Sequence, residues 1–148
     1  MLLILPTAQD QIERAFDPTY GAGEFILLVG VASTVVGSLV TYDGTTYQTT
    51  LCATTANQAR PVAVAMSANT AGLFGWYQIE GTAVVTKTTG AKVNPTVAIG
   101  VVSTGKIGAS ASGKEILGAR SANAATVASA TTTVNVVINR PHLQGRIT

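Results

Sequence analysis

The stretch FGWYQIEGTAVVTK, residues 74–87, carries the longest β pattern of the chain. Successive side chains of a strand point to opposite faces, so Trp76 and Gln78 lie on one face and Tyr77 lies on the other. Gly81 interrupts the pattern and indicates a bulge or a bend. The stretch therefore predicts one long strand with an irregularity at Gly81.

Two shorter apolar runs precede this strand. Residues 25–29, FILLV, are continuously apolar and bounded by glycines, which is typical of a strand buried on both faces. Pro61 ends the segment before it, and residues 62–66, VAVAM, form a second short apolar strand.

A hairpin is predicted between those two runs. Asp43-Gly44 is a strong signal for a two-residue turn, and it separates strand candidates at residues 35–42 and 45–51. In such a turn Val40 faces Tyr47, and an aromatic ring opposite a β-branched side chain is a favourable cross-strand pair.

The C-terminal half continues the β pattern. Apolar residues recur over residues 93–101 and 115–119. In the last strand, Val134, Val136 and Ile138 alternate with Asn135 and Asn139. Arg140-Pro141 is expected to end the last strand, because proline has no amide hydrogen to donate. The alanine-rich residues 121–130 are compatible with a loop or one short helix.

These elements predict an all-β fold. About seven to nine short strands with turn signals roughly every ten residues are typical of a sandwich or a barrel. A length of 148 residues suits one domain. We therefore predict a compact β-sandwich or β-barrel-like domain over residues 24–148, preceded by an extended N-terminal arm over residues 1–23.

The arm begins with the apolar sequence MLLIL followed by Pro6. Apolar side chains in a row lower solubility when exposed, so they need a surface to bury against. That surface is either the core of the same chain or a neighbouring subunit, and the sequence leaves both open. Residues 8–16 have enough helix-forming residues for one or two helical turns but no strong cap.

Charge is scarce in this chain. Only 11% of residues are Asp, Glu, Lys or Arg, against about 25% in an ordinary soluble domain. The net charge of +2 comes from nine scattered basic residues, whereas nucleic-acid binders gather such residues on one face. No run approaches the roughly 20 apolar residues of a membrane span. We expect neither nucleic acid nor a membrane as partner, and a surface of neutral small residues that other proteins cover.

Two segments resemble a phosphate-binding loop. GVVSTGKI at residues 100–107 and GASASGKE at residues 108–115 both have the glycine and lysine spacing. Both lack the final Ser or Thr that holds magnesium, and neither opens a helix. We therefore expect no nucleotide site.

The other chemistry-bearing residues are few. The one cysteine, Cys52, has no partner for an intrachain disulfide and is expected to be a small apolar filler at a strand end. The one histidine, His142, has no evident nucleophile or orienting acid around it. Zinc-type sites need several Cys or His ligands. We predict no enzyme, no metal, no cofactor and no small-molecule substrate.

Trp76-Tyr77 is the one notable aromatic pair in a chain with 5% aromatic residues. Exposed rings on a sheet stack on sugars or bases, but we expect one ring to fill the core and the other to reach an interface. The residues predicted to contact a partner are Met1, Leu2, Leu3, Ile4, Leu5, Pro6, Phe16, Trp76, Tyr77, Arg140 and His142.

Four segments together resemble capsid decoration proteins, also called cement proteins, of tailed bacteriophages. They are GEFILLVGVA at residues 23–32, VTYD at residues 40–43, PVAVAMS at residues 61–67 and YQIEG at residues 77–81. The resemblance covers roughly residues 20–140 and includes no catalytic motif.

This resemblance implies an all-β domain, made in the cytoplasm of a bacterial host, that binds the outer surface of the capsid and stabilises the shell. The implied partners are the major capsid protein and other copies of the chain, with a trimer favoured and a dimer as the alternative. A phage tail or fibre β-module that binds protein or glycan is the alternative function.

Overall fold

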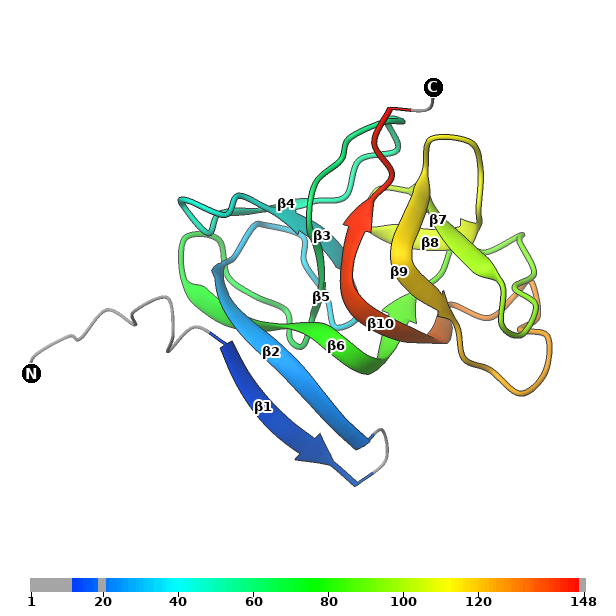
Figure 1. Cartoon of the computed structure of the whole chain (residues 1–148), viewed down its shortest axis with the longest axis horizontal. Coiled ribbons are helices and arrows are strands. Elements are labelled where there is room, and N and C mark those ends of the chain that lie inside the picture. Colours follow the sequence, from blue (N-terminus) through cyan, green and yellow to red (C-terminus); the bar gives the residue numbers. More distant parts are fainter. Residues whose placement is uncertain (1–11, 19–20, 147–148) are drawn as a thin grey trace, which may run out of the picture.

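The computed structural model describes residues 12–18 and 21–146 and contains only strands, turns and loops within them. The ten strands are β1 (Ile12–Asp17), β2 (Gly21–Val29), β3 (Leu39–Tyr42), β4 (Thr49–Leu51), β5 (Val62–Ala65), β6 (Phe74–Thr86), β7 (Ala98–Ser103), β8 (Lys106–Ala109), β9 (Glu115–Ser121) and β10 (Thr133–Leu143). The all-β prediction is confirmed, and the strands form one antiparallel sheet that curls into a half-barrel (Figure 1).

Strand β6 organises the sheet. Its first half pairs with β2, its second half pairs with β10, and β5 pairs with it as well. The change of partner from β2 to β10 falls at Gly81, which has a positive φ of 102°. A Cβ atom at this position would lie 2.7 Å from the backbone oxygen of Ala22, so a side chain does not fit. The irregularity predicted at Gly81 is therefore present, and it lets two strands share β6.

Two hydrophobic cores fill the curled sheet. The first core consists of Ile26, Leu28, Val40, Ala63, Ala65, Tyr77 and Ile79. The second core lies among β6, β7, β8, β9 and β10 and also takes Leu39, Val62 and Val64 from β3 and β5. Strands β3 and β5 separate the cores, because their successive side chains enter the first and the second core in turn.

The N-terminal hairpin begins within the range that was expected to be an arm. Residues 12–17 form β1, which pairs with β2 from Ile12–Ile26 to Asp17–Gly21. Helical turns are therefore absent from residues 12–16. The hairpin projects from one side of the molecule in Figure 1. The apolar residues Met1–Pro6 lie outside the described residues.

The predicted two-residue turn at Asp43-Gly44 is wrong. Strands β3 and β4 pair with Tyr42 opposite Thr49, so the loop spans residues 43–48. Asp43 Oδ1 accepts hydrogen bonds from the amides of Thr45 and Thr46 at 2.7 and 2.9 Å, which holds a wider turn. Val40 lies opposite Leu51 rather than Tyr47, and the Tyr47 carbonyl accepts a hydrogen bond from the amide of Val29.

Two strand limits also differ from the sequence prediction. Residues 35–38 form a turn, so β3 begins only at Leu39. Strand β10 continues through Arg140-Pro141 to Leu143, because a bulge between Ile138 and His142 accommodates the proline. Residues 121–130, for which a loop or a short helix is expected, contain no helix: Ser121 ends β9 and the rest form turns and loops.

Candidate protein-binding face

Strand β2 divides its side chains between two environments. Glu24, Ile26 and Leu28 are buried, whereas Phe25 and Leu27 are only half-buried on the opposite side. The expectation that residues 25–29 are buried on both faces is therefore wrong for one face. Neither Phe25 nor Leu27 belongs to either of the two hydrophobic cores, whereas all four residues of β5 do.

Strand register shows which neighbours share this side. Phe25 lies opposite Glu13 of β1, and Leu27 lies opposite Trp76 of β6. Residues opposite one another in an antiparallel pair point to the same face. Met66 follows β5 and its amide donates to the Trp76 carbonyl at 3.2 Å. We call this the outer face; its residues are Glu13, Ala15, Phe25, Leu27, Met66, Phe74 and Trp76.

The outer face is hollowed rather than flat. A hollow of about 300 Å³ is lined by Glu13, Ala15, Phe25, Met66 and Trp76. A second hollow of about 300 Å³ is lined by Val36, Ala65, Met66, Gln78, Thr82 and Val84. Met66 borders both hollows. We call the first hollow, which is lined from β1, β2 and β6 and by Met66, the groove.

The groove is apolar and partly exposed. Met66 is 42% exposed and Phe74 is 47% exposed, and Leu73 beside them is 62% exposed. Glu13 is the one charged residue among the seven of the outer face. An exposed apolar groove of this kind is typical of a surface that another segment or protein covers.

Gln78 marks where the outer face ends and the second core begins. It lies opposite Val64 of the second core and is itself buried. Its Nε2 atom donates to the backbone oxygens of Glu80 and Thr82 at 3.0 and 3.1 Å. The Gln78 side-chain amide thus has hydrogen-bond partners. Trp76, two residues earlier, is the first β6 side chain on the outer face that lies beyond the second core.

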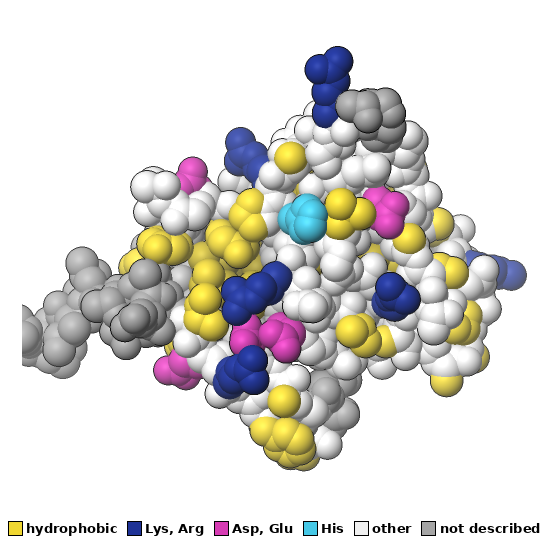
Figure 2. All heavy atoms as spheres, in the orientation of Figure 1, with side chains coloured by type: hydrophobic (Ala, Val, Ile, Leu, Met, Phe, Trp, Pro, Cys, Tyr) yellow, Lys and Arg dark blue, Asp and Glu magenta, His cyan; other side chains and the backbone are white. Residues whose placement is uncertain are grey.

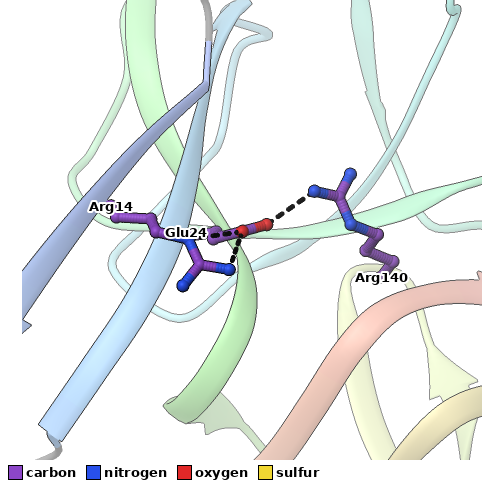
Figure 3. Close-up of polar contacts among 3 residues, drawn as sticks. All are labelled: Arg14, Glu24 and Arg140. Carbon is purple, nitrogen blue, oxygen red and sulfur yellow. Dashed lines mark hydrogen bonds and ion pairs between the residues drawn. The ribbon is translucent and has the colours of Figure 1, made fainter.

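On the other side of the hairpin, Glu24 holds two arginines (Figure 3). Glu24 Oε1 accepts a hydrogen bond from Arg14 Nε at 3.0 Å and forms an ion pair with Arg14 Nη2 at 2.8 Å, and Oε2 accepts from Arg140 Nη2 at 2.6 Å. The Glu24 side chain is 8% exposed, whereas the two arginines are 80% and 57% exposed. Strand register explains the meeting, because Glu80 of β6 pairs with both Glu24 of β2 and Asn139 of β10.

The environment of Glu24 changes its pKa. Burial acts to raise the pKa, but the hydrogen bond from Arg14 and the positive charges of Arg140 and Arg14 lower it by more. Glu24 is therefore held as a carboxylate that links the β1–β2 hairpin to β10. These contacts account for the position of Arg140, whose φ of 43° lies within the bulge of β10.

The structure separates the residues that were predicted to contact a partner. Trp76 lines the groove, and Phe16 is 74% exposed on the side of β1 away from Glu13. His142 is exposed on β10, opposite Leu117 of β9. Tyr77 is fully buried in the first core, so its prediction as a contact residue is corrected. Of this aromatic pair, Tyr77 is thus the ring that fills the core and Trp76 the ring that reaches the surface.

Sequence reasoning missed Phe25, Leu27, Met66 and Phe74 as surface residues. A continuous apolar run carries no alternation, so residues 25–29 do not reveal which side is uncovered. The one signal in the sequence is Glu24, because a charged side chain needs a polar environment. Phe25 and Leu27 are an odd number of positions from Glu24 and therefore lie on the opposite side of the strand.

The residues considered for chemistry occupy structural positions. Residues 100–107 form the β7–β8 hairpin and residues 108–115 the link from β8 to β9, so neither opens a helix. Cys52 is buried in the second core, where burial raises its pKa to about 12. The described residues contain no group of three His, Cys, Asp or Glu side chains placed to hold a metal ion. They also contain no helix long and apolar enough to cross a membrane.

Comparison with known proteins gives no match: no family model, no curated protein and no solved structure is similar to this chain. The function must therefore be inferred from the outer face and from the composition of the surface around it.

Proposed function

We propose that this chain is a structural virion protein that binds the outer surface of a tailed-phage capsid and stabilises the shell. The outer face carries this proposal: an exposed apolar groove on an all-β domain is a surface for contact with another protein. The proposed partners are the major capsid protein and further copies of the chain, with a trimer favoured.

The surface around the groove supports a role in a packed assembly. Figure 2 shows few charged side chains on a face that is mostly neutral or apolar, and basic and acidic groups lie next to one another near its centre. A freely diffusing protein usually keeps more charge for solubility. Neutral Thr, Ser and Ala side chains allow neighbouring subunits to approach without charge repulsion, which suits a protein that covers a shell.

Stabilisation of a shell requires contacts and not catalysis. Each apolar contact of this size is weak, since burial contributes about 25 cal/mol per Å² of apolar surface. An oligomer that is held at several points gains strength from the high effective concentration of its remaining contacts. A cement protein built on this fold therefore works by adding many modest contacts across subunit boundaries.

The proposal is tested by mixing the purified chain with capsids that lack it. Saturable binding at fixed lattice positions is expected, with added resistance of the shell to heat. Met66→Glu places a charge in the groove and is expected to weaken binding at least about tenfold, a change of about 1.4 kcal/mol. Val137→Glu is the matched control, because Val137 is 44% exposed on β10 outside the groove.

The possible results test the cement function and the choice of binding face independently. Absence of binding by the unaltered chain contradicts the cement function. If Met66→Glu leaves capsid binding unchanged and Val137→Glu removes it, the chosen binding face is wrong but the cement function stands.

The half-buried Trp76 in a hollow also suits a tail or fibre module that binds glycan. The apolar lining argues against it, because sugar hydroxyls need several hydrogen-bonding partners, and the lining side chains offer only the Glu13 carboxylate and the Trp76 indole N–H. A glycan array separates the two functions: specific binding that Trp76→Ala removes supports the glycan module.

A further inference from the structure

We propose that the groove of the outer face is the seat of this chain's own N-terminal residues Leu2–Leu5. The inference goes beyond the proposed function, since it concerns the free protein in solution. It joins two apolar features that lack an explanation alone: a groove that nothing in the described residues covers, and an apolar run that needs a covering surface.

The point where β1 begins favours this seat. Strand β1 is described from Ile12, which lies opposite Ile26 of β2 and next to Leu27 of the outer face. Further along β2, the backbone of Val29 is bonded to another segment. The amide of Val29 donates to the Tyr47 carbonyl at 2.9 Å, and Thr49 Oγ1 donates to the Val29 carbonyl at 2.6 Å. The described part of the chain therefore begins close to Phe25 and the groove.

The reach of the chain is sufficient. Trp76 lies two strands away from β1, which is roughly 10 Å at the usual strand spacing, and Met66 lies about one strand further. Residues 6–11 span up to about 20 Å when extended, and residues 2–5 cover about 13 Å. A short linker also keeps the local concentration of the segment in the millimolar range, which favours the same chain over a neighbour.

The composition of the segment suits the groove. The lining side chains Phe25, Met66 and Trp76 are apolar, and residues 2–5 are Leu-Leu-Ile-Leu. In an extended segment alternate side chains point to opposite sides. Two of the four therefore fill the groove and the other two face outward. The covered face thus stays apolar and is available to a further protein, which agrees with the proposed capsid contact.

Trp76 is the only tryptophan in the chain and lines the groove, so it reports on occupancy directly. The experiment measures acrylamide quenching of Trp76 fluorescence in the full-length protein without capsids. Because covering a half-exposed ring removes much of its contact with solvent, Leu3→Glu combined with Leu5→Glu is expected to raise the quenching constant about twofold and to shift emission to the red.

Three controls make the test decisive. Met66→Glu should raise quenching as much as the double variant, and combining all three should add little, because both remove the same contact. Val137→Glu, outside the groove, should leave quenching unchanged. Circular dichroism must show that each variant keeps the all-β spectrum.

Two results would overturn the proposal. Unchanged quenching in the Leu3→Glu, Leu5→Glu variant shows that the segment does not cover Trp76. Protection that disappears on hundredfold dilution of the unaltered chain shows that a neighbouring copy supplies the segment. Capsid binding is measured separately, so failure here does not decide the cement function.

Discussion

Strands β2 and β5 are both mainly apolar, but they differ in what covers them. All four residues of β5 are buried, because β5 stands between the two cores. Strand β2 is buried on the side of Ile26 and Leu28 and only half-buried on the side of Phe25 and Leu27. Similar composition thus gives a strand buried on both sides in β5, and a strand with one partly exposed apolar side in β2.

The difference comes from the partners of β6. The second half of β6 pairs with β10, which brings the second core over the neighbouring part of β5. The first half pairs with β2 and β1, and the sheet there has a core on one side only. An uncovered apolar side in this position is a consequence of topology, and it is available for function.

Matched charge substitutions should give the largest contrast. Val64 is 1% exposed and Met66, two residues later, is 42% exposed. Val64→Glu buries an unpaired carboxylate and should cost more than about 4 kcal/mol of unfolding free energy, whereas Met66→Glu should cost less than about 1 kcal/mol. Urea denaturation measures both; equal losses would mean that the outer face belongs to a core.

Adjacent leucines of β2 test the same contrast within one strand. Leu28 is fully buried in the first core, and Leu28→Ala should cost about 2–5 kcal/mol. Leu27 is half-buried on the outer face, and Leu27→Ala should cost about 1 kcal/mol. If chemical denaturation shows Leu27→Ala to be the more harmful change, the assignment of the two faces is reversed.

Acid should weaken the link between the hairpin and β10. The folded pKa of Glu24 lies below its ordinary value of 4.5, so the stabilisation by Arg14 and Arg140 is complete above about pH 4.5. It is lost as the pH falls through the lowered pKa. The Tm of the native chain should therefore fall more steeply below pH 4.5 than that of Glu24→Gln. Glu13→Gln, on the outer face, serves as control and should keep the native slope.

Tyr77 should give the smallest effect. It lies opposite Ile26 of β2 and Ala65 of β5, and its buried hydroxyl has no hydrogen-bond partner among the described residues. Tyr77→Phe removes an unsatisfied polar group and keeps the ring, so stability should stay within about 0.5 kcal/mol or rise. A loss above about 1.5 kcal/mol in thermal unfolding would reveal a partner for the hydroxyl.

The sequence predicts much of this fold because local patterns determine it. Alternation in residues 74–87 and in residues 134–138 locates β6 and β10, and Gly81 locates the irregularity. The hairpin at Asp43 was mispredicted because the carbonyl of Tyr47 is used by Val29, a contact between residues far apart in sequence. Strand β10 passes through Pro141 for a similar reason, since a bulge against β9 removes the need for its amide.

The candidate site was less predictable. Trp76 was identified as a possible contact residue, and the structure places it in the groove. Its neighbours Phe25 and Met66 were expected to belong to ordinary apolar strands, because burial on one or both sides depends on which strands pair with β6. Arg140 was identified without its partner Glu24, which lies 116 residues away in the sequence.

The central claim is that the outer face binds the capsid, and site-specific cross-linking tests it most directly. A photo-reactive amino acid is placed at position 66 in one variant and at position 137 in another, and decorated capsids are irradiated. The account predicts a covalent product with the major capsid protein from position 66 and little from position 137. A product from position 137 alone, on particles that both variants decorate equally, would contradict it.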